Sequence, residues 1–93
     1  MTYRLVFRVS AEKPWRKLRS TVREQFQKKL VERLEQPRIR PDALHGFPDH
    51  YKIKLRDAGY RLVYRVEDLT VTVLVVSIGK RERSEAYRKI PRE

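Results

Sequence analysis

The chain has 93 residues and no cysteine, and its 23 lysines and arginines against 12 aspartates and glutamates give a formal net charge of +11. This length suits one small domain, which we expect to span residues 1–93, and leaves no room for a nucleotide-binding domain plus a substrate domain. Without cysteine there is no disulfide framework and no zinc–thiolate site. The charge favours an anionic partner, such as nucleic acid, a ribosome or an anionic membrane.

No segment of the sequence predicts a membrane span or a secretory signal. The longest apolar run, Val73–Val76, has four residues, whereas a transmembrane helix needs about 20. Arg4 and Arg8 interrupt the stretch that a signal peptide would need to be apolar. We therefore expect no membrane partner and a cytoplasmic location.

The first half of the sequence predicts one strand and two helices. Residues 2–8 alternate apolar and cationic side chains, as a strand does. Helices are predicted over residues 11–19 and 21–36, with Pro14 in the first turn of the earlier one because proline fits only there. The second helix has a polar side, which includes Arg33. Its apolar side chains recur every four residues and predict a core-facing stripe; they are Val22, Phe26, Leu30 and Leu34, with Val31 beside them.

The second half predicts three strands and a short last helix. Residues 51–56 alternate strictly between apolar and cationic, Asp57–Gly59 is a turn signal, and residues 60–66 form the next strand. Residues 70–78 are β-branched and apolar on both faces, which is typical of a central strand, and Gly79 is expected to end it. Residues 80–90 predict a short polar helix at best.

Together these elements predict an α+β fold in the order β-α-α-β-β-β-α. Strands joined by short turns pair antiparallel, so we expect an antiparallel sheet. The two-helix hairpin must cover one face of that sheet. The other face is then expected to stay open.

The two strands on either side of the Asp57–Gly59 turn can pair in two classes of register, and only one of them places the apolar side chains on one face and the cationic side chains on the other. With Leu55 opposite Tyr60, the residues expected to face the core are Tyr51, Ile53, Leu55, Leu62 and Tyr64. The residues expected on the open face are Lys52, Lys54 and Arg61, with Arg56 and Arg65 near its edges. A slip of one residue would mix the two sets.

The grouped cations allow two interpretations. One is a solvated face kept for solubility. The other is RNA or DNA binding, which we favour because like charges directly opposite each other destabilise a sheet unless an anion joins them. His45 and His50 are either an acid–base pair or, as we favour, loop residues, and their spacing to nearby aspartates does not predict a metal site.

Cations and one aromatic ring suffice in principle for RNA cleavage, because RNA carries its own nucleophile, the 2′-OH. Crowded lysines lower one another's pKa, so that one of them can accept a proton. Arginines clamp phosphate oxygens, and an aromatic ring holds a splayed base.

Several segments resemble the RelE family of toxin endoribonucleases, part of the RelE/ParE superfamily. In the predicted helices they are WRKL (15–18), STVREQ (20–25), KKLVE (28–32) and PRI (37–39). In the predicted sheet and last helix they are YKIKLR (51–56), GYRLVY (59–64) and GKRERSE (79–85). The resemblance implies a RelE-like microbial RNase fold and the toxin of a type II toxin–antitoxin system.

The resemblance also implies a reaction and its partners. RelE toxins enter the ribosomal A site and cut mRNA there without metal or cofactor. The 2′-OH attacks the adjacent phosphate and leaves a 2′,3′-cyclic phosphate and a 5′-OH. The implied partners are the ribosome with A-site mRNA and a RelB-type antitoxin, and operator DNA is reached only through the antitoxin complex.

The family's catalytic residues carry over to Lys52, Lys54, Arg61, Arg81 and Tyr87. We assign Lys54 as the base, Lys52 as the cation that lowers its pKa, and Arg61 as the phosphate clamp. Arg81 is assigned to the side of the leaving oxygen, and Tyr87 to stacking on a codon base. The residues assigned to RNA or ribosome binding are Arg56, Arg65, His45, Lys80 and Arg83; His45 stands where the family commonly has arginine.

Two alternative functions remain open from the sequence. One is a ParE-like inhibitor of DNA gyrase with the same fold, although such proteins generally lack the joint set of lysines, arginines and tyrosine. The other is a non-catalytic RNA-binding or ribosome-binding module.

Overall fold

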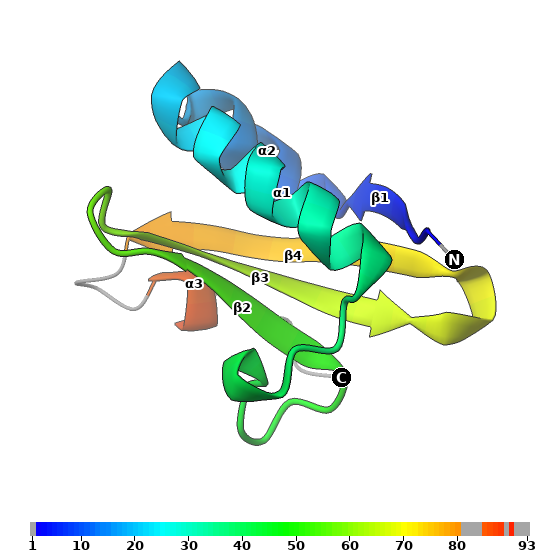
Figure 1. Cartoon of the computed structure of the whole chain (residues 1–93). Helices are drawn as coiled ribbons and strands as arrows, with labels where there is room; N and C mark the ends of the chain where they lie inside the picture. Colours follow the sequence, from blue (N-terminus) through cyan, green and yellow to red (C-terminus); the bar gives the residue numbers. More distant parts are fainter. Residues whose placement is uncertain (1, 81–84, 89, 91–93) are drawn as a thin grey trace.

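The computed structural model describes residues 2–80, 85–88 and 90. Helices α1 and α2 lie on one face of a β-sheet and the short α3 lies on the other (Figure 1). Within this part of the chain no helix has the length and apolar character needed to cross a membrane. The elements are β1 (Arg4–Phe7), α1 (Val9–Lys17), α2 (Ser20–Glu35), the 3-10 turn η1 (Arg40–Asp42), β2 (His50–Leu55), β3 (Tyr60–Glu67), the 3-10 turn η2 (Asp68–Thr70), β4 (Thr72–Lys80) and α3 (Glu85–Arg88).

The predicted α+β class and element order are confirmed, but the sheet is mixed rather than antiparallel. Its strand order is β1-β4-β3-β2. β2, β3 and β4 are joined by short turns and pair antiparallel, whereas β1 pairs parallel with β4. No short turn joins β1 to another strand, because the helical hairpin separates it from them, and such a crossover permits parallel pairing.

The predicted register between β2 and β3 is confirmed. Leu55 lies opposite Tyr60, and Ile53 lies opposite Leu62. The turn between them closes through the Gly59 amide, which donates to the Leu55 carbonyl at 2.8 Å. Gly59 has a φ of +74°, a left-handed conformation that glycine adopts without steric cost.

The main core lies between the sheet and the helices. It contains all five predicted strand residues and the apolar face of α2. Val31 is an exception to the predicted stripe, since 64% of its surface is exposed. A helix on a surface buries only a limited stripe, and Val31 lies one helical step beyond the buried Leu30.

Helix α1 begins earlier than predicted and contains Pro14 in its interior. The Ala11 amide donates to the Arg8 carbonyl at 2.8 Å, so the first turn forms ahead of the proline. Trp15 packs against Phe7, with ring centroids 4.9 Å apart, and this contact to β1 supports the helix beyond the proline. Tertiary packing thus outweighs the local cost of Pro14.

The second face of the sheet is not fully open, which corrects the prediction. A smaller cluster buries Val63 and Val76 against Ala86 and Ile90. A β-bulge supports it: Ser77 lies opposite Val63 and Val75 lies opposite Tyr64, so Val76 is the additional residue. The Ser77 hydroxyl donates to the Ala86 carbonyl at 2.5 Å and fixes α3 to β4.

Strand β4 also continues past Gly79, where the sequence predicted its end. Arg61 lies opposite Gly79 and Tyr60 lies opposite Lys80. Glycine weakens a strand through entropy, but continued pairing with β3 keeps the backbone extended here. The pairing therefore runs to the beginning of β3, where Arg61 is located.

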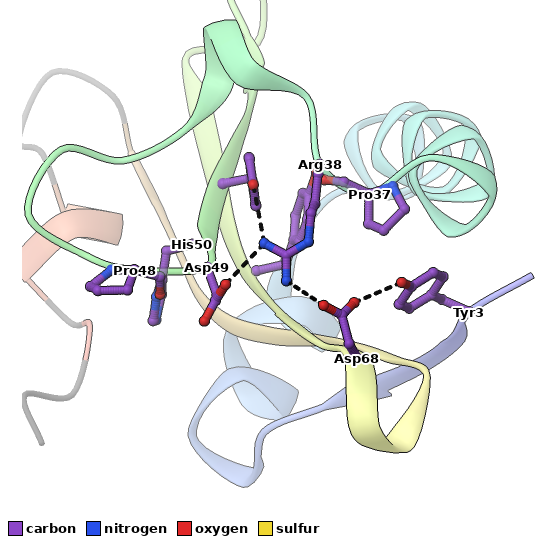
Figure 2. Close-up of polar contacts among 9 residues, drawn as sticks. Tyr3, Pro37, Arg38, Pro48, Asp49, His50 and Asp68 are labelled. Carbon is purple, nitrogen blue, oxygen red and sulfur yellow. Dashed lines mark hydrogen bonds and ion pairs between the residues drawn. The ribbon is translucent and has the colours of Figure 1, made fainter.

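A polar network fastens the end of the sheet that lies away from the Gly59 turn (Figure 2). Arg38 donates to the Asp49 carboxylate at 2.9 Å and to the Asp68 carboxylate at 2.8 Å. The Tyr3 hydroxyl donates to the other oxygen of Asp68 at 2.7 Å. The bonds from Tyr3 and Arg38 hold the pKa of Asp68 below its usual value. The network ties four separate segments together.

Replacing Gly59 tests the turn that sets the register. In Gly59→Ala, an added Cβ meets no atom within 4 Å, so the strain comes from the backbone alone. We expect the free energy of unfolding to fall by about 1–2 kcal/mol, the usual cost of a left-handed L-residue. Gly59→Asn should lose less, because asparagine tolerates this conformation better. Urea denaturation measures both, and equal losses would contradict the backbone explanation.

Candidate functional site

Three of the predicted catalytic cations lie on the face of the sheet turned away from α1 and α2. On β2, Lys52 and Lys54 alternate with the buried Tyr51, Ile53 and Leu55, so their side chains belong to the opposite face. Arg61 on β3 lies directly opposite Lys54. All three are half-buried. The antiparallel pairing of β2 with β3 thus brings three positively charged side chains together on one face.

The pKa of Lys54 is lowered from its ordinary value. The positive charge of Lys52 is the largest cause, followed by burial and then by Arg56 and Arg61, while the carboxylate of Asp42 acts in the opposite direction. A second ammonium beside Lys54 disfavours its charged form, so the amine loses its proton more readily. The arrangement therefore makes Lys54 easier to deprotonate than an isolated lysine.

Arg61 and Tyr87 are in direct contact. The guanidinium carbon of Arg61 lies 4.9 Å from the centre of the Tyr87 ring, which is a cation–π geometry. The Arg61 Nε is buried and has no hydrogen-bond partner among the described residues. Buried donors are usually paired, and an oxygen of an anion would satisfy this one.

Tyr87 is held in place from β4 rather than by its own helix, which has only four residues. Its neighbour Ala86 is buried and accepts the hydrogen bond from Ser77. Tyr87 itself is half-buried and packs against the smaller core cluster. The bulge in β4 therefore helps to place the Tyr87 ring beside Arg61.

The residues predicted to bind RNA or the ribosome are more dispersed. Arg65 pairs with the carboxylate of Glu67, with its Nε 3.1 Å from Oε2. Arg56 and Lys80 are exposed, in the turn after β2 and at the end of β4. His45 is exposed in the loop between η1 and β2. Arg81 and Arg83 lie outside the described residues.

The two histidines differ in their environment. Both line a hollow formed by residues 43–51. His50 begins β2 rather than lying in the loop, and its Nδ1 is 2.8 Å from the Pro48 carbonyl oxygen. Among the described residues, no group of three or more histidines, aspartates or glutamates is suited to hold a metal ion.

The sequence pattern did not predict the ion pair between Arg33 and Asp42. Arg33 was expected on the polar side of its helix, but only 14% of its side chain is exposed and it forms an ion pair with Asp42. The spacing contains a signal for this position, because Phe26, Leu30 and Arg33 follow the i, i+4, i+7 pattern of one helix face. Asp42 lies in η1, and its charge acts on Lys54.

Known proteins are similar to this chain in sequence and in fold. The model of the family described as ParE toxin of the type II toxin–antitoxin system, parDE, matches residues 5–85. The mRNA interferase toxin RelE of Escherichia coli strain K12 is 64% identical over 87 residues, which cover 94% of this chain and 92% of that protein. The chain belongs to the RelE toxin family.

Solved RelE structures have the same architecture. A mutant of E. coli toxin RelE in the free state matches with a TM-score of 0.89 and 61% identity, covering 96% of this chain and 94% of that one. RelE in the intact E. coli RelBE toxin–antitoxin complex matches with a TM-score of 0.82 and 63% identity, covering 84% and 95%. The similarity therefore includes the sheet that carries the cations.

Replacing Lys52 tests the electrostatics of the lysine pair. In Lys52→Gln, the largest cause of the lowered Lys54 pKa is removed, so this pKa should rise towards its ordinary value. Side-chain NMR shifts of Lys54, followed through a pH titration, measure the change. Lys28→Gln, which removes an exposed lysine of α2, is the matched control and should leave Lys54 unchanged. An unaltered titration of Lys54 in Lys52→Gln would contradict this account.

Proposed function

We propose that the chain is the toxin of a type II toxin–antitoxin system and cleaves mRNA in the ribosomal A site, which stops translation. The observation that carries this proposal is the 64% identity to the mRNA interferase toxin RelE over nearly the whole chain. Its partners are the ribosome and a RelB-type antitoxin, as in the RelBE complex of the similar toxin. Because ribosomes are its target, the proposed location is the cytoplasm.

The proposed reaction uses the 2′-OH of the RNA as nucleophile and requires no metal. Lys54 takes the proton of the 2′-OH, supported by its lowered pKa. Lys52 supplies the charge that lowers this pKa and contacts the phosphate. The step forms a bond from the 2′-oxygen to phosphorus and breaks the bond from phosphorus to the 5′-oxygen. The 5′-oxygen takes up a proton from the solvent, so the products are a 2′,3′-cyclic phosphate and a 5′-OH.

Arg61 is proposed to bind the phosphate, where charge increases in the transition state. Its buried, unpartnered Nε and its half-buried side chain support this role. Arg81 is proposed on the side of the leaving oxygen, which rests on the resemblance of the GKRERSE segment. Tyr87 is proposed to stack on a codon base. The remaining binding contacts are proposed for Arg56, Arg65, His45, Lys80 and Arg83.

A ParE-like function deserves a direct comparison, because the matching family model is described as ParE toxin. The protein that is 64% identical over nearly the whole chain is, in contrast, named an mRNA interferase toxin. The cationic face with Tyr87 beside Arg61 also suits RNA more than a protein surface. RNA cleavage is therefore the function that the observations favour.

Primer extension on mRNA from cells that express the chain tests the function. We expect cuts within codons, and purified components should cleave A-site mRNA at least about 100-fold faster than naked RNA. The reason is that a site of cations and one tyrosine depends on the ribosome to align its substrate. Gyrase-linked DNA breaks with intact mRNA would support the ParE-like alternative. Arrest of translation with intact mRNA would support a non-catalytic module.

Substitutions of Tyr87 separate stacking from proton transfer. Tyr87→Phe keeps the ring and its contact with Arg61, so most single-turnover cleavage on saturating ribosomes should remain. Tyr87→Ala removes the ring, and the lost stacking of about 1–3 kcal/mol corresponds to a rate loss of roughly 10-fold to 100-fold. Thermal unfolding of both variants controls for the packing of α3 against the sheet. Equal losses in the two variants would assign the chemistry to the hydroxyl and remove the base role from Lys54.

A further inference from the structure

Arg33 connects four elements behind the lysine pair. Its Nη2 donates to the Asp42 carboxylate in η1 at 2.6 Å. Its Nη1 donates to the Tyr64 hydroxyl of β3 at 2.8 Å and to the main-chain carbonyl of Lys52 in β2 at 3.3 Å. Tyr64 in turn donates to the Pro37 carbonyl at 2.6 Å. One guanidinium on α2 therefore holds η1, β2 and β3 in a fixed arrangement.

The hydrogen bond from Arg33 to the Lys52 carbonyl holds the main chain of β2, which is the last strand in the sheet. β2 pairs with β3 on one side. The loop after η1 runs along the other side of β2. Ala43 forms an isolated β-bridge with Tyr51, and the Leu44 amide donates a hydrogen bond to the His50 carbonyl at 2.9 Å. Arg33 fixes both this loop and β2, and so the backbone from which the two lysines project.

The same ion pair places a negative charge close enough to act on Lys54. The charged groups that act on Lys54 are Lys52 in the same strand, Arg56 after it, Arg61 in β3 and Asp42 in η1. The three cations favour the neutral amine, while Asp42 favours the ammonium. The position of the Asp42 carboxylate therefore limits how readily Lys54 loses its proton.

Stability alone does not account for a half-buried ion pair. The side chains of Arg33 and Asp42 are only 14% and 25% exposed, so both charges lose much of their hydration. Replacing such a pair with apolar residues is often neutral or stabilising, because desolvation offsets the attraction. Because Arg33 also donates to the Lys52 carbonyl, the ion pair is in a position to hold the strand that carries the two lysines.

We propose that the Arg33–Asp42 ion pair is a positioning element of the lysine pair, which fixes the β2 main chain at Lys52 and holds η1, with the Asp42 carboxylate, against that strand. Its catalytic consequence rests on the proposed function, since only cleavage through Lys54 depends on that placement. The placement itself is measurable without any cleavage. Neither residue contacts the RNA in this proposal.

Asp42→Asn tests the electrostatic part. The amide keeps an oxygen for Arg33 but removes the negative charge, so the pKa of Lys54 should fall further. NMR titration of the Lys54 side chain measures this directly. In cleavage on saturating ribosomes, the acid limb of the kcat profile should move to lower pH, because deprotonated Lys54 is the base. Glu12→Gln removes an equal charge from the exposed pair with Arg16 and should move neither.

Arg33→Met and Arg33→Lys test the positioning part. Arg33→Met removes all three donated bonds, and kcat on saturating ribosomes should fall about 10-fold to 100-fold while KM changes less than about twofold. Arg33→Lys keeps a charge and a donor and should regain part of the loss. Arg16→Met is the matched control on exposed α1. Should Arg33→Met fail to fold, Arg33→Met with Asp42→Asn leaves no charge unpaired and should show the same loss.

The outcomes distinguish this inference from the proposed function. An unchanged Lys54 pKa in Asp42→Asn, or a kcat of Arg33→Met within about twofold of the parent chain, would overturn the inference. A parent chain that leaves A-site mRNA intact would overturn the proposed function, and the NMR titration would still decide the placement of Asp42. A Lys54 pKa that moves while the cleavage profile stays fixed would overturn the catalytic part and the role of Lys54 as base.

Discussion

The pairing of β2 with β3 is the constraint on which both the core and the cationic face depend. β2 alternates apolar and cationic side chains, and β3 carries Arg61 between two apolar residues, so the register of the two strands decides which face receives each set. With Leu55 opposite Tyr60, the apolar set completes the core beneath the helices. The same pairing sets Lys54 opposite Arg61 on the other face. A shift by one residue would bury charge and expose the core, which makes alternative registers unstable.

This constraint explains why much of the fold could be predicted from the sequence. Residues 51–56 alternate strictly between apolar and cationic, and this pattern allows one class of register with residues 60–66 when one face of the sheet is covered by helices. The structure has a register of that class. The buried Phe26 and Leu30 of α2 likewise follow from helical periodicity. These features depend on local patterns, and local patterns are directly visible in a sequence.

The features that sequence analysis missed depend on contacts between distant segments. The parallel pairing of β1 with β4 requires knowledge of where the helical hairpin returns the chain. The cluster under α3 requires the β-bulge at Val76, and no glycine or other turn residue in this segment of the sequence predicts a bulge. Arg33 was assigned to the polar side because it is charged, although its spacing from Leu30 places it on the inner face. Its burial depends on Asp42, which the chain brings in from η1.

The cationic face is stable because its charges are supported from the opposite side of the same strands. Lys54 and Arg61 lie opposite each other in the pairing of β2 with β3, where like charges repel and destabilise the sheet. The opposing stabilisation comes from Ile53 and Leu62, which lie opposite each other in the buried layer one residue along each strand. Arg33 adds a connection from the helical layer to the backbone of Lys52. The inner residues of β2 and β3 therefore stabilise the pairing of the two strands, and this stabilisation offsets the repulsion among Lys52, Lys54 and Arg61 on the outer face.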